Sequence, residues 1–152
     1  MGRPDALRCR GDRSEVTGRI TDGAGDAVVD AAVEIWQSSP PADERFPGYG
    51  RSATDGEGRF RFVTLKPEAV PGNGNQTQAP HLSVVLLARG LMTGLRTRIY
   101  FQGENLNETD PLLSSIEDPA ERATLIAKPA GAGTWNLDIR LQGAGETVFL
   151  EV

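Results

Sequence analysis

The stretch TDGEGRFRFV, residues 54–63, joins a tight turn to an alternating strand. Its first half is a cluster of turn residues, in which glycine can supply the positive φ angle that tight turns require. In its second half, Phe60 and Phe62 share one face while Arg59 and Arg61 share the other. This alternation predicts a β-strand that buries one face and exposes the other to water.

The same period-two pattern recurs in other parts of the chain. The run LSVVLLA, residues 82–88, is apolar on both faces, which predicts a central strand. Turn clusters separate the predicted strands at short intervals, and this arrangement is typical of an antiparallel sandwich or barrel. The further strands that we expect span residues 16–21, 31–37, 95–101, 134–142 and 146–152.

Two segments depart from the strand pattern. Residues 67–80 are polar and rich in proline and glycine, so we expect a loop without strands. In residues 118–127, Asp118 is a candidate N-cap and Pro119 takes the first helical position, which predicts a helix start. The helix should be short, because its last four residues, TLIA, are equally typical of a strand.

The composition restricts the classes of function. A length of 152 residues predicts one domain over residues 1–152, with residues 1–15 as a short, disordered arm. A net charge of −5 argues against nucleic-acid binding. One cysteine and one histidine exclude an internal disulfide, a cysteine-based zinc site and a histidine-rich metal site. No apolar run approaches the roughly 20 residues of a membrane helix and the start lacks the apolar core of a signal peptide, so we expect a cytoplasmic protein.

Residues 18–37, 48–67 and 79–101 together resemble the intradiol ring-cleavage dioxygenases. The second block is the most specific, because the pattern G-R-x-x-T-D-x-x-G-x-F-x-F-x-T-x-K-P runs through it. The resemblance implies an all-β fold, an antiparallel, prealbumin-like β-sandwich, to which the residue pattern adds one short helix. It also implies a reaction that inserts both atoms of O₂ between the hydroxyl-bearing carbons of a catechol. The family performs this reaction at a non-haem Fe(III) held by two tyrosines and two histidines.

Four positions correspond to the iron ligands of the family, and at most one of them keeps a ligand. Val70 stands where the second tyrosine is expected, and the H-x-H pair is reduced to His81 followed by Ser83. The first tyrosine is also missing, because Tyr49 comes too late in the pattern. Fe(III) is a hard cation that needs phenolate or other anionic oxygen donors. We therefore expect no metal site and no catalytic residue in this chain, and we interpret His81 as a structural relic of a metal site.

Arg89 closes the predicted central strand and is the candidate substrate-binding residue. For family members built from two homologous chains, the resemblance implies that an iron-free alpha chain pairs with a beta chain that holds the Fe(III). The arginine of the L-x-A-R-G segment then reaches the shared active site, where the ring carboxylate of the substrate binds. A guanidinium suits that role through paired, charge-assisted hydrogen bonds. The implied partner is a homologous iron-bearing beta chain in a hetero-oligomer, and the implied substrate is a small aromatic acid.

Two other interpretations stay open on the sequence. A stand-alone, prealbumin-like binding module would explain the first block and the missing ligands equally well. An inactive, shortened paralogue is the second, because only about fifteen residues precede Val16, whereas alpha chains of the family carry a longer N-terminal arm.

Overall fold

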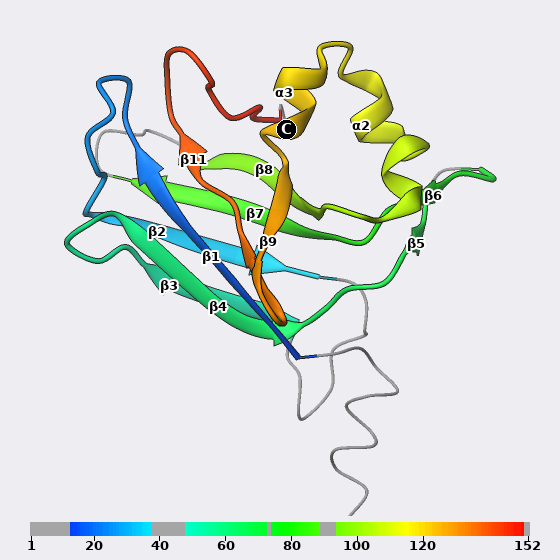
Figure 1. Cartoon of the computed structure of the whole chain (residues 1–152), viewed down its shortest axis with the longest axis horizontal. Coiled ribbons are helices and arrows are strands. Elements are labelled where there is room, and N and C mark those ends of the chain that lie inside the picture. Colours follow the sequence, from blue (N-terminus) through cyan, green and yellow to red (C-terminus); the bar gives the residue numbers. More distant parts are fainter. Residues whose placement is uncertain (1–12, 38–47, 73, 89–93, 151–152) are drawn as a thin grey trace, which may run out of the picture.

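The computed structural model shows β-strands in two layers around a common core (Figure 1). It describes residues 13–37, 48–72, 74–88 and 94–150. In chain order the strands are β1 (Arg13–Thr21), β2 (Ala31–Trp36), β3 (Tyr49–Ala53), β4 (Arg59–Leu65), β5 (Val70–Pro71), β6 (Thr77–Gln78), β7 (His81–Ala88), β8 (Leu95–Phe101), β9 (Ile126–Gly131), β10 (Thr134–Asn136) and β11 (Ile139–Arg140).

A single mixed sheet forms both layers. Its strands follow the order β11-β1-β10-β9-β8-β7-β2-β3, and β4 pairs with β1 beside this path. The layer that contains β1 and β4 lies over the layer that contains β2 and β7 (Figure 1). Buried side chains from both layers meet in the main core, among them Val16, Phe60, Leu82 and Ile99. The prediction of an all-β sandwich is therefore confirmed.

The stretch at residues 54–63 folds as its pattern predicts. Gly58 takes a φ angle of +77° in the turn, and β4 follows directly. Phe60 and Phe62 are buried, and the arginines that alternate with them are exposed. β4 pairs antiparallel with β1, so that Phe60 lies opposite Gly18. The turn and the strand therefore bring two aromatic rings into the main core.

The prediction that residues 82–88 form a central strand is confirmed. These residues belong to β7, which lies between β2 and β8 and pairs antiparallel with both. Leu82, Val84 and Leu86 are buried on the inner face. The outer face is less covered, since Leu87 is 37% exposed.

Some strand pairs are parallel, which the sequence pattern did not indicate. β1 pairs in parallel with β10 and β11, and β8 pairs in parallel with β9. Parallel neighbours need a long crossover connection. Between β8 and β9 this crossover carries the short helices η1 (Asn105–Glu108), α2 (Pro111–Ser115) and α3 (Pro119–Ala123).

Several segments differ in detail from the sequence expectations. The strand predicted at 134–142 is divided into β10 and β11, because the Asp138 carboxylate accepts from Arg19 N at 3.0 Å in place of a ladder bond. Residues 67–80, expected to lack strands, contain the hairpin β5–β6, which reverses at Gly74 with a φ angle of +62°. Residues 13–15, placed in the disordered arm, belong to β1. In the last predicted strand, the described residues form a single bridge from Leu150 to β8.

The helix predicted after Asp118 is confirmed as α3. The Asp118 carboxylate accepts from Ala120 N at 2.8 Å, and Pro119 stands at the first helical position. A second short helix, α2, begins in the same way, with Asp110 as its N-cap and Pro111 as its first residue. Within the described parts of the chain, no helix has the length and apolar character that crossing a membrane requires.

Candidate functional site

Three of the four ligand-like positions meet in one small cavity. Val70, His81 and Ser83 line this cavity, which has a volume of about 230 Å³. His81 and Ser83 project from the same face of β7, because they are two residues apart in a strand. Val70 comes from β5, so the β5–β6 hairpin is the element that brings it to the start of β7. The other walls are Trp36, Gln37, Pro67 and Glu68.

His81 is held in one orientation by the backbone before it. Its Nδ1 lies 2.8 Å from the carbonyl oxygen of Ala79. A carbonyl only accepts, which assigns the proton to Nδ1 and leaves Nε2 as an acceptor in the neutral ring. Burial lowers the pKa of His81 below its usual value, and the positive charge of Arg98 adds to this effect. The histidine is therefore a neutral, oriented imidazole near pH 7.

A buried carboxylate fixes the entrance to β7. Asp110 is fully buried and accepts a hydrogen bond from Ala79 N at 2.8 Å and one from the Tyr100 hydroxyl at 2.9 Å. It also accepts two backbone N–H groups from the first turn of α2. Asp110 thus connects Ala79, whose carbonyl binds His81, to the first turn of α2.

Sequence reasoning missed Asp110 and Arg98. Both form a hydrogen bond with the Tyr100 hydroxyl, and the Tyr100 ring lies beside His81. A signal for Asp110 was present, since Asp110-Pro111 repeats the helix-start pattern of the pair at 118–119. No comparable signal marked Arg98, whose place becomes clear only when β8 is paired with β7.

The donors around the cavity do not suit the ferric ion that the resemblance implies. Val70 offers no ligand atom, and Ser83 and His81 supply no phenolate or other anionic oxygen. Among the described residues of the lining, Glu68 is the single carboxylate, and it is exposed. Across the residues that the structure describes, no group of three His, Cys, Asp or Glu side chains is placed to hold a metal ion. We therefore assign no metal chemistry to this cavity.

Arg89, the predicted substrate-binding residue, lies outside the described residues. The residue before it, Ala88, ends β7 at the opposite end from His81. At the usual rise of a strand, these two ends are about 23 Å apart. Ala88 is therefore far from the cavity that Val70, His81 and Ser83 form.

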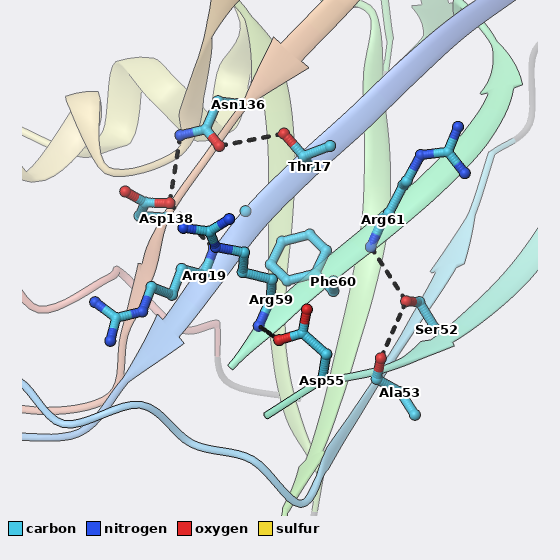
Figure 2. Close-up of a pocket in the computed structure, with 11 residues that line it drawn as sticks. Thr17, Arg19, Ser52, Ala53, Asp55, Arg59, Phe60, Arg61, Asn136 and Asp138 are labelled. Atoms are coloured by element: carbon cyan, nitrogen blue, oxygen red, sulfur yellow. Dashed lines mark hydrogen bonds between the residues drawn. The ribbon is translucent and has the colours of Figure 1, made fainter. Parts of the chain in front are cut away.

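A larger hollow of about 660 Å³ lies on the solvated face of β1 and β4 (Figure 2). Val70, His81 and Ser83, the predicted positions that the structure describes, do not line it. Its arginines are already engaged: Arg19 Nε donates to the Glu57 carbonyl at 2.9 Å, and Arg61 pairs with Glu15. Arg59 pairs with the Glu57 carboxylate at 3.3 Å. We therefore interpret this hollow as part of the solvated outer face.

A family model and several known proteins that are similar to this chain are all described as dioxygenases. A family model described as "Dioxygenase" matches residues 5–143. The chain is 36% identical to the protocatechuate 3,4-dioxygenase alpha chain of Pseudomonas putida, over 99% of this chain and 80% of that one. It is 35% identical to the alpha chain of Burkholderia cepacia, over 93% and 78% of the two chains. The beta chain of the Burkholderia cepacia enzyme is 36% identical, over 78% of this chain and 56% of that one.

Solved structures show the same fold. The dioxygenase domain of a dioxygenase–carbohydrate-binding fusion from Streptomyces sp. SirexAA-E superposes with a TM-score of 0.67 at 28% identity, covering 88% of this chain and 82% of that one. Catechol 1,2-dioxygenase from Acinetobacter sp. ADP1 has a TM-score of 0.66 at 19% identity, covering 86% and 52%, and supports the fold alone. From the family match and the alpha-chain relatives together, the chain belongs to the intradiol ring-cleavage dioxygenase family.

Proposed function

We propose that this chain is the iron-free alpha subunit of a protocatechuate 3,4-dioxygenase. In this role it forms a hetero-oligomer with a homologous beta subunit and completes the active site of that subunit. The Fe(III) of the beta subunit supplies the O₂ chemistry, and protocatechuate is cleaved to 3-carboxy-cis,cis-muconate. A cytoplasmic location fits the proposal, because the single cysteine leaves no internal disulfide for an oxidising compartment to form.

The cavity around His81 is the observation that carries this proposal. It gathers Val70, His81 and Ser83, as a former iron site would, yet it offers one imidazole where phenolate donors are needed. Identity to alpha chains over nearly the whole length supports the same role. An iron-free chain of this family needs a second chain for its chemistry, and a homologous beta chain is the partner that these relatives offer.

Arg89 is the residue that we propose to bind the substrate. Its guanidinium can bind the ring carboxylate of protocatechuate by donating two parallel N–H···O bonds. Such a contact orients the ring, so that its two hydroxyl groups face the iron of the partner.

Co-expression with a beta subunit that carries two tyrosine and two histidine ligands tests the proposal. We expect the two chains to co-purify, to contain iron and to consume O₂ in the presence of protocatechuate. This chain purified alone is the control and should be iron-free and inactive. Chains that do not associate, or a complex that is inert toward protocatechuate, would contradict the proposal.

A further inference from the structure

Arg98 is a half-buried cation without a direct ion pair in the described parts of the chain. It lies on β8 opposite Ser83. Its Nη1 donates to the Tyr100 hydroxyl at 2.9 Å. Among the described residues, the guanidinium makes no other hydrogen bond and no carboxylate contact. A guanidinium carries five N–H donors, so most donors of Arg98 have no acceptor in this part of the chain.

Asp110 does not supply the missing acceptor. Its two carboxylate oxygens accept the Tyr100 hydroxyl and three backbone N–H groups. Three of these donors converge on Oδ1 and one reaches Oδ2, and none of the ion pairs among the described residues joins Asp110 to Arg98. Tyr100 stays neutral as well, because burial raises the pKa of its hydroxyl far above the usual value. Arg98 therefore has no carboxylate partner in the described parts of the chain, and its partial burial favours an acceptor for its free N–H donors.

The side chain of Arg98 lines a pocket of about 200 Å³ between the β5–β6 hairpin and α2. α2 contacts β6, and both lie toward the right-hand side of the view in Figure 1. Pro111 and Leu112 give the pocket an apolar wall, and Gln76 and Gln78 add amide groups. The described residues of its lining include no acidic side chain. The space suits a single small ring, since a cavity of roughly 150 Å³ can hold benzene.

We propose that Arg98 and this pocket form a binding site for a small organic carboxylate. The carboxylate pairs with the planar guanidinium through two N–H···O bonds, and the apolar body of the ligand packs on Pro111 and Leu112. Gln78 Nε2 donates to the Pro71 carbonyl at 3.2 Å, which holds its amide at the pocket edge. All of these residues belong to this chain, so binding can be tested on the full chain by itself.

An NMR titration of the isolated full chain with benzoate tests this site. We expect benzoate to shift the backbone amides of Gln78 and Leu112 and the Nε–H of Arg98. Arg98→Gln should raise the Kd for benzoate by about tenfold or more, because it removes a charge-assisted, bidentate contact. Arg96→Gln is the matched control on the same face of β8 and should leave the Kd unchanged.

Two further arms decide what the pocket recognises. Benzamide has the shape of benzoate without the charge and should not bind, whereas binding equal to that of benzoate would overturn carboxylate recognition. Inorganic phosphate that binds while benzoate does not would overturn the ligand class. If Arg98→Gln does not fold, Arg98→Lys replaces it and should weaken binding, because an ammonium lacks the planar fork. Unchanged benzoate affinity in the variant that folds would overturn the role of Arg98.

Discussion

His81 is the first residue of β7 and lines the cavity that it shares with Val70 and Ser83. Its Nδ1 is bound by the Ala79 carbonyl, and its ring lies 5.4 Å from the ring of Tyr100. Burial of the ring, with the positive charge of Arg98, favours its neutral form over the charged form. Since it is the single histidine in the sequence, its titration can be observed without interference from another imidazole.

The lowered pKa of His81 predicts that the free energy of unfolding depends on pH. The unfolded chain binds the proton more readily than the folded chain, with an ordinary pKa near 6.5. The contribution to stability is therefore complete above pH 6.5 and is lost as the pH falls through the lower folded-state pKa. The slope in this window is at most about 1.4 kcal/mol per pH unit. Urea unfolding between pH 5 and 7.5 measures it.

The His81→Gln variant provides the control for this pH dependence. Glutamine does not titrate, so the slope between pH 5 and 6.5 should become shallower than in the unmodified chain. An identical slope in the two proteins would show that other groups cause the pH dependence of stability and that folding does not lower the pKa of His81.

Arg89 is predicted to act on substrate affinity and not on the metal. In a complex with the beta subunit, Arg89→Ala should raise KM for protocatechuate by about tenfold or more and leave the iron content unchanged. The KM of Arg89→Lys should lie between those of the unmodified complex and Arg89→Ala, because lysine keeps the charge but loses the bidentate fork. Steady-state O₂ uptake measures the KM of each complex. An unchanged KM in Arg89→Ala would remove this residue from the site.

At the scale of elements, local chemistry decides which structures the sequence can predict. The alternation around Phe60 and Phe62 and the N-cap at Asp118 depend on neighbouring residues, and both predictions are confirmed. The parallel pairing of β1 with β10 depends on residues more than a hundred positions apart, which no local pattern encodes. Val70, His81 and Ser83 were identified through the family resemblance, whereas their meeting depends on the β5–β6 hairpin that the local pattern did not predict.

Close packing between β1, β4 and the β10–β11 break predicts a sensitive glycine. A Cβ added at Gly18 would lie 1.9 Å from the Leu137 carbonyl oxygen and 2.5 Å from the Phe60 ring. Because a backbone atom must move, Gly18→Ala should destabilise the fold by about 1–3 kcal/mol or more. Gly56→Ala is the control, since nothing lies within 4 Å of its added Cβ. Equal urea midpoints for the two variants would contradict the close approach of these strands.

For the whole molecule, the crossover between β8 and β9 does more than connect two parallel strands. It contributes Leu113 and Leu125 to a second core cluster with Ala79 and Tyr100, on the side of the sheet away from the main core. It also supplies Asp110, which lies 31 positions from Ala79 in the sequence. One crossover thus covers the end of β7 that bears His81 and forms one wall of the pocket at Arg98.

Iron analysis of the complex between this chain and a beta subunit tests the central claim most directly. If this chain has lost the metal site and serves an iron in its partner, the purified complex contains one iron for each pair of chains. The same value is expected when His81 is replaced by alanine, because His81 holds no metal in this account. Two irons per pair, or a loss of iron in the His81→Ala complex, would contradict the claim that this chain is iron-free.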